Sequence, residues 1–82
     1  MGLTAHDAAV VAAILKSNTS VTMVDLYGNT EIGDEGAKVL VEALKVNTTV
    51  TLLGLGSCGI GEQGKQLLRA AVVNRQGFKL FH

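Results

Sequence analysis

Apolar residues along this chain alternate between two spacings. From Val21 to Tyr27 apolar and polar side chains alternate, which predicts a short strand. From Asp34 onward apolar residues recur every three or four positions, which predicts one buried face of a helix. The same pair returns as a predicted strand over Val50–Leu55 and a predicted helix from Gln63 to about Val73.

Two further elements complete the pattern. A helix over about Thr4–Lys16 opens the chain, with Thr4 suited to be its N-cap. The apolar segment Phe78–Phe81 predicts a last strand. The resulting order, α-βα-βα-β, favours a parallel sheet with right-handed crossovers.

The alternation reflects an internal repeat. Lys16–Thr22 returns as Lys45–Thr51 at an offset of 29, with five of seven residues identical, and Ile32–Gly36 returns as Ile60–Gly64 at an offset of 28. A match that survives a one-residue gap indicates equivalent structural units. We divide the chain into four parts, which are an N-terminal helical half-repeat (1–20), repeat 1 (21–49), repeat 2 (50–77) and the strand of a partial third repeat (78–82).

The strand-and-turn segments fit the leucine-rich-repeat pattern L-x-x-L-x-L-x-x-N/C. The two matches are Val21-x-x-Val24-x-Leu26-x-x-Asn29 and Val50-x-x-Leu53-x-Leu55-x-x-Cys58. With their helical halves, they resemble the long-helix type found in ribonuclease inhibitor and in the sensing ends of NOD-like receptors. The resemblance implies an α/β fold, a short horseshoe segment of the right-handed β-α superhelix, with three short parallel strands and the helices on the convex side.

The pattern also assigns roles to its residues. Val24, Leu53 and Phe81 are expected in one inward-facing row of the sheet. Asn29 is expected to hydrogen-bond backbone groups at the turn, and Cys58 to do so more weakly through its thiol.

Composition narrows the function. Seven Lys and Arg balance seven Asp and Glu, which argues against nucleic acid as a partner, and 48% hydrophobic residues argue against disorder. A single cysteine excludes an internal disulfide and a cysteine-built zinc site. The longest apolar run, Ala8–Leu15, is far shorter than the ~20 residues of a membrane helix. We therefore expect a cytoplasmic protein with no cofactor, no metal and no membrane contact.

Chemical motifs are few. Gly54–Gly59 matches G-x-G-x-x-G, which would suit a nucleotide phosphate, but repeat 1 has Asp25, Tyr27 and Glu31 at the aligned positions. Nucleotide binding is therefore the less favoured reading, and Cys58 has no identifiable base beside it. His6 and His82 share no acid at ligand spacing. The sequons at Asn18 and Asn47 coincide with the helix-to-strand joint of the repeat.

We therefore expect a non-enzymatic protein–protein interaction module, whose partners are another protein or further copies of itself. A purely structural, self-assembling repeat unit is the alternative. Strand alternation predicts a protein-binding concave face made of Met23, Asp25, Tyr27, Leu52, Gly54, Gly56 and Leu80. Neither end shows an evident polar cap, so we expect either a fragment of a larger array or self-association through the ends. The residues expected to self-associate are Val10, Ala13, Phe78, Leu80 and Phe81.

Overall fold

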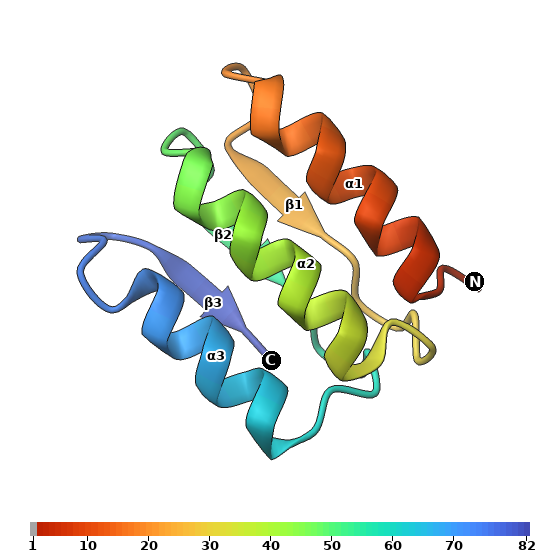
Figure 1. Ribbon diagram of the computed structural model, residues 1–82. Coiled ribbons are helices and arrows are strands. Elements are labelled where there is room, and N and C mark those ends of the chain that lie inside the picture. The colour runs from red at the N-terminus through yellow and green to blue at the C-terminus, as the bar shows by residue number, and fades with distance from the viewer. Residues whose placement is uncertain (1) are drawn as a thin grey trace.

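The computed structural model describes residues 2–82 and contains three helices and three strands in the predicted order. The elements are α1 (Ala5–Ser17), β1 (Met23–Asp25), α2 (Gly33–Val46), β2 (Leu52–Gly54), α3 (Glu62–Val72) and β3 (Lys79–Phe81). Figure 1 shows the helices side by side, covering one face of the sheet. The strands are shorter than predicted, because alternation continues into the flanking turns.

The sheet is parallel throughout, with strand order β1-β2-β3. Val24 on β1 lies in register with Leu53 on β2, as expected. The predicted architecture, a small α/β leucine-rich-repeat segment, is confirmed.

The predicted register of β3 is wrong by one residue. Leu53 pairs with Leu80, and Gly54 pairs with Phe81. Leu80 therefore joins the inward row, where it packs against the core, while Phe81 is 55% exposed. Apolar side chains occupy both positions 80 and 81, so the hydrophobic pattern fits either register and cannot choose between them.

The core fills the layer between the sheet and the helices. Its fully buried large side chains come from repeats 1 and 2 and comprise Ile32, Leu40, Val50, Leu53, Leu55, Cys58 and Leu68. Strands contribute alternate residues, and helices contribute residues three or four apart. Each repeat therefore buries its apolar side against its neighbour.

The two turns use different side chains for the same bond. The Asn29 amide donates to the Leu26 carbonyl at 2.8 Å, and the Cys58 thiol donates to that same carbonyl at 3.0 Å. The Asn29 side-chain oxygen also accepts the Leu3 N–H at 3.2 Å. The expected roles of Asn29 and Cys58 are confirmed.

Asn47, at the helix-to-strand joint, is only 5% exposed. Its amide nitrogen donates to the carbonyls of Leu15 and Asn18 at 2.7 and 2.8 Å. Its oxygen accepts the backbone N–H groups of Thr49 and Val50. This side chain links two repeat segments, a role that accounts for the sequon there.

The helix starts are capped in two ways. Thr4 forms a capping box with Asp7, because the Asp7 N–H donates to the Thr4 hydroxyl while the Asp7 carboxylate accepts the Thr4 N–H at 2.9 Å. These hydrogen bonds from Thr4 lower the pKa of the Asp7 carboxyl. At α3 the carboxylate comes from the preceding helix, since the Gly61 N–H donates to Asp34 at 2.6 Å.

Candidate protein-binding face

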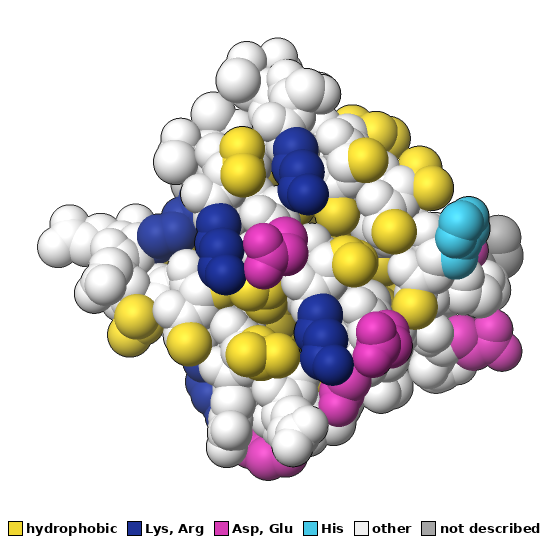
Figure 2. All heavy atoms as spheres, in the orientation of Figure 1, with side chains coloured by type: hydrophobic (Ala, Val, Ile, Leu, Met, Phe, Trp, Pro, Cys, Tyr) yellow, Lys and Arg dark blue, Asp and Glu magenta, His cyan; other side chains and the backbone are white. Residues whose placement is uncertain are grey.

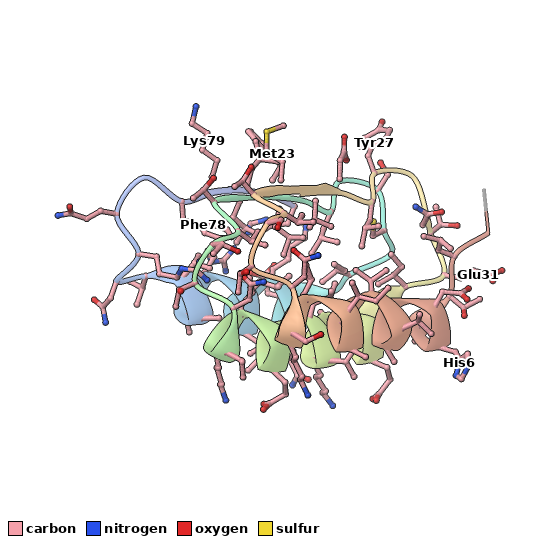
Figure 3. The ribbon with its side chains drawn as sticks, turned by 90° about the horizontal axis from the view of Figure 1, so that it is seen from above. His6, Met23, Tyr27, Glu31, Phe78 and Lys79 are labelled. Atoms are coloured by element: carbon pink, nitrogen blue, oxygen red, sulfur yellow. The ribbon has the colours of Figure 1, made fainter. Side chains whose placement is uncertain are left out.

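The outer sheet face, opposite the helices, carries large exposed side chains. Met23 is 65% exposed and Tyr27 is 69% exposed. Figure 3 shows Met23, Tyr27 and Lys79 projecting from the sheet on the side away from the helices, whereas Phe78 lies between the two layers. This face is free of the helices that cover the other side.

All seven residues predicted for the concave face border one open hollow of about 770 Å³ on it. The full lining is Met23, Asp25, Tyr27, Leu52, Gly54, Gly56, Leu80, Phe81 and His82. Most of these groups are apolar, so the hollow suits apolar side chains of a partner more than a charged ligand.

The contribution of β3 to this face differs from the prediction. Leu80 was expected to extend the outward row of Met23 and Leu52, but Lys79 is the residue paired with Leu52. Leu80 borders the hollow with its side chain in the core row, and Phe81 stands beside Gly54. The sequence analysis missed Lys79 and Phe81, although a strict two-residue alternation that starts with Phe78 inward would have found both.

The glycines of the hollow have a steric role. A Cβ added at Gly54 would lie 2.8 Å from the Asp25 carboxylate, and one added at Gly56 would lie 2.9 Å from the Tyr27 ring. Asp25 and Tyr27 therefore lean over the second strand. Glycine at positions 54 and 56 leaves room for these two side chains of repeat 1. The first two glycines of the G-x-G-x-x-G match are therefore accounted for without phosphate binding.

Protein atoms also fill the remaining positions that a phosphate would need at this loop. Gly59 has a φ of +71°, and a Cβ there would collide with the Thr30 carbonyl. The start of α3, where a phosphate would bind, receives the Asp34 carboxylate. The three glycines of the motif are thus explained by stacking of repeat 2 on repeat 1.

Polar chemistry around the hollow is limited. The Asp25 carboxylate accepts the Tyr27 N–H at 3.0 Å. Cys58 lies beneath the turn, 1% exposed, and burial raises the pKa of its thiol. A protonated thiol donates the hydrogen bond to Leu26 and is a poor nucleophile.

His6 lies on the helix side of the molecule, apart from the sheet face (Figure 3). Among residues 2–82 no group of three His, Cys, Asp or Glu side chains comes close enough to hold a metal ion. None of the helices in the same part of the chain is long and apolar enough to cross a bilayer.

The residues predicted for self-association are not equally available. Val10, Ala13 and Phe81 are exposed. Phe78 and Leu80 are half-buried against the core, and the Arg75 guanidinium lies 4.9 Å from the centre of the Phe78 ring. Arg75 also donates to the carbonyls of Leu44 and Val50, as Asn47 does for the joint before it.

Comparison with known proteins agrees with this geometry. A leucine-rich-repeat family model matches residues 17–41. The bovine (Bos taurus) protein "NACHT, LRR and PYD domains-containing protein 5" is 36% identical over 77 residues, which are 93% of this chain and 7% of that protein. The solved structure of "Leiomodin-1 Actin-Binding Site 2 (ABS2)" superposes with a TM-score of 0.83 at 26% identity, covering 96% of this chain and 45% of the other.

Stacked strand–turn–helix units with a parallel sheet and buried Asn or Cys turns define a leucine-rich-repeat solenoid. The chain belongs to the leucine-rich-repeat proteins, of the type found in NOD-like receptors. It is a protein-interaction module. It spans 7% of the length of the bovine relative and 45% of the leiomodin chain.

Proposed function

We propose that this chain binds another protein through the outer sheet face, with Met23, Tyr27 and Phe81 as its main contacts, and that it does so without catalysing a reaction. The observation that carries the proposal is the apolar hollow, bordered by three large side chains that are each more than half exposed. Aromatic residues and methionine are enriched at protein interfaces, because they bury a large area with few rotatable bonds.

The glycine floor supports the same reading. Gly54 and Gly56 carry no side chains, and Asp25 at the end of β1 and Tyr27 in the turn after it lie over them. A partner would therefore meet the Asp25 carboxylate and the Tyr27 ring in the middle of the face. Asp25 and Lys79 add one charge of each sign to the same face, which would orient a partner more than hold it.

The proposal is tested with three immobilised chains, namely wild type, Met23→Asp and Val46→Asp. Val46 is 58% exposed on α2, away from the hollow, so its variant adds the same charge to an exposed apolar site elsewhere. Proteins captured from a cell extract are quantified on each. Monomeric actin is assayed in the same format as a defined probe, because the leiomodin neighbour is named as an actin-binding site.

We expect a partner that wild type and Val46→Asp retain and that Met23→Asp loses by tenfold or more, since a charge at a buried contact costs ~1.4 kcal/mol or more. Capture that is the same on all three chains would contradict the proposal. Loss on Val46→Asp with retention on Met23→Asp would move the binding surface to the helices.

Association between copies is a second candidate, favoured by exposed apolar side chains at both ends of the solenoid. Val10 on α1 is 51% exposed and Phe81 on β3 is 55% exposed. A repeat end without a neighbour leaves apolar surface in water, and a second copy would cover it. Sedimentation equilibrium tests this, because association makes the average mass rise with concentration.

A further inference from the structure

The hollow on the outer sheet face contains one acidic side chain, Asp25, among apolar groups. Its Oδ1 accepts the Tyr27 N–H at 3.0 Å, and a Cβ added at Gly54 would lie 2.8 Å from the same oxygen. These two contacts place the carboxylate over the second strand and leave its other oxygen, Oδ2, to accept further hydrogen bonds. The hollow therefore offers a negative charge at a defined position.

The acidic side chains on the helices are placed differently. Glu35, Glu42 and Glu62 each pair with a Lys or Arg of the same helix, at 3.2 to 3.4 Å. Figure 2 shows this side of the molecule, where positive and negative side chains lie next to each other. Within residues 2–82 the Asp25 carboxylate forms an ion pair with no Lys, Arg or His. Its charge is available to a partner.

Exposed aromatic side chains stand near that carboxylate. Tyr27 is 69% exposed in the turn after β1, and Phe81 is 55% exposed on β3. Asp25 pairs with Gly54, which pairs with Phe81, so the three residues form one row across the sheet. Parallel strands lie ~4.8 Å apart, which separates the backbones of Asp25 and Phe81 by about 10 Å. Because a glycine lies between them, one incoming group can reach the carboxylate and the rings together.

This combination suits a cation. Aromatic ring faces attract positive charge, and the carboxylate supplies the opposite charge. Among cationic side chains arginine matches best, because its planar guanidinium stacks on aromatic rings and donates parallel N–H groups to a carboxylate. It is also more weakly hydrated than the ammonium of lysine, so an apolar hollow costs it less desolvation.

Lys79 gives the face a direction. It pairs with Leu52 in the row that contains Met23, whereas Asp25 and Phe81 share the next outward row. A cation brought to the Met23 row would meet the positive charge of Lys79, and a cation brought to the next row would meet the carboxylate. Charge therefore favours a cation at the Asp25 end of the hollow.

We propose that the Asp25 end of the hollow takes an arginine side chain of the protein partner. The Asp25 carboxylate accepts the guanidinium N–H groups, while Tyr27 and Phe81 lie against the guanidinium plane. This contact adds to the apolar contacts at Met23 and sets which part of the partner lies at this end. The inference names the chemistry of the partner and rests on the proposed function.

Peptide titrations followed by NMR test the contact. The probes are capped tripeptides with arginine, lysine or citrulline between two glycines, and citrulline is a neutral side chain of nearly the same shape as arginine. They are added to the ¹⁵N-labelled chain at pH 8 up to about 20 mM, because a single side-chain contact gives millimolar affinity. The arginine peptide should shift the Gly54 and Gly56 amide signals saturably. The citrulline peptide should bind about fivefold or more weakly.

Two variants locate the charge. Asp25→Asn keeps an oxygen for the Tyr27 N–H, so it should fold normally and bind the arginine and citrulline peptides equally. Glu35→Gln removes a carboxylate that is 80% exposed on α2, and it should keep the wild-type preference. Tyr27→Leu should reduce the preference for arginine over lysine, because leucine offers no ring face.

Several outcomes would overturn the inference. These are equal binding of the arginine and citrulline peptides to wild type, no saturable shift with any peptide, or an unchanged preference in Asp25→Asn. Lysine binding as tightly as arginine would overturn arginine as the occupant. Failure of the proposed function itself is separate, because it appears in the capture assay as equal retention on wild type, Met23→Asp and Val46→Asp.

Discussion

Repeat 1 and repeat 2 share a backbone course and a core, yet they differ where one lies against the other. Asp25 and Tyr27 of repeat 1 lean over Gly54 and Gly56 of repeat 2, and Thr30 presses its carbonyl on Gly59. Repeat 1 thus has large side chains at these positions, and repeat 2 has glycines that leave room for them. The residues that are identical in the two repeats therefore determine the shared fold, whereas the residues that differ form the contact between the repeats.

The largest effect is expected from Gly59→Ala. The new methyl would collide with the Thr30 carbonyl, and the residue would also keep a φ of +71°. We expect a loss of about 3 kcal/mol or more in the free energy of unfolding, measured by urea denaturation.

Gly77→Ala is the matched control for that change. Gly77 has a φ of +76°, and its added Cβ would meet no atom within 4 Å. Gly77→Ala should lower the free energy of unfolding by only about 1 to 2 kcal/mol, because only the cost of an alanine at positive φ applies. Equal losses in both variants would show that repeat 2 does not press on repeat 1 at Gly59.

The next effect concerns the joints. Asn47→Ala removes a buried side chain that bonds the Leu15 and Asn18 carbonyls and two backbone N–H groups. We expect a loss of about 2 to 3 kcal/mol in thermal or urea unfolding, because buried backbone groups lose their partners. The Asn18 side-chain oxygen accepts two backbone N–H groups at a more exposed joint. Asn18→Ala should therefore lower the free energy of unfolding by roughly 1 kcal/mol. The reverse order would contradict the linking role of Asn47.

A smaller effect tests the outer face. Gly56→Ala brings a methyl within 2.9 Å of the Tyr27 ring, which can move away. We expect a loss of about 1 kcal/mol in wild type and a smaller one in a Tyr27→Ala background. A double-mutant cycle measures this coupling, and a coupling of zero would mean that Tyr27 does not lie over Gly56.

The smallest effect is the pH dependence of the α1 cap. Hydrogen bonds from Thr4 lower the pKa of Asp7 in the folded chain. The cap therefore stabilises the fold above the ordinary carboxyl pKa of about 3.9, and this stability is lost as pH falls through the lower folded value. Asp7→Asn should be less stable than wild type at pH 7, and the difference should shrink by pH 2. A difference independent of pH would contradict the charge-based cap.

Much of the fold follows from periodicity. The order of helices and strands, the Thr4 cap and the Asn29 and Cys58 turn bonds were all predicted, because each depends on local spacing or on a residue type with few alternatives. The outer face was predicted for the same reason. Alternation fixed which side Met23 and Tyr27 take.

The rest depends on contacts between neighbours, which one sequence does not contain. Phe81 and Leu80 are both apolar, so the hydrophobic pattern does not decide which one faces inward, and the pairing of β3 with β2 does. Asp34 suits the start of its own helix by charge, yet it caps the next one.

The most direct test of the account is a side-chain NOE spectrum of the isolated chain, because the registers of β1, β2 and β3 decide which residues form the binding face. We predict cross-peaks between the methyl groups of Val24 and Leu53 and between those of Leu53 and Leu80. The Phe81 ring should instead contact Gly54. Cross-peaks between the Phe81 ring and the Leu53 methyls, with none from Leu80, would contradict the register and remove Phe81 from the proposed binding face.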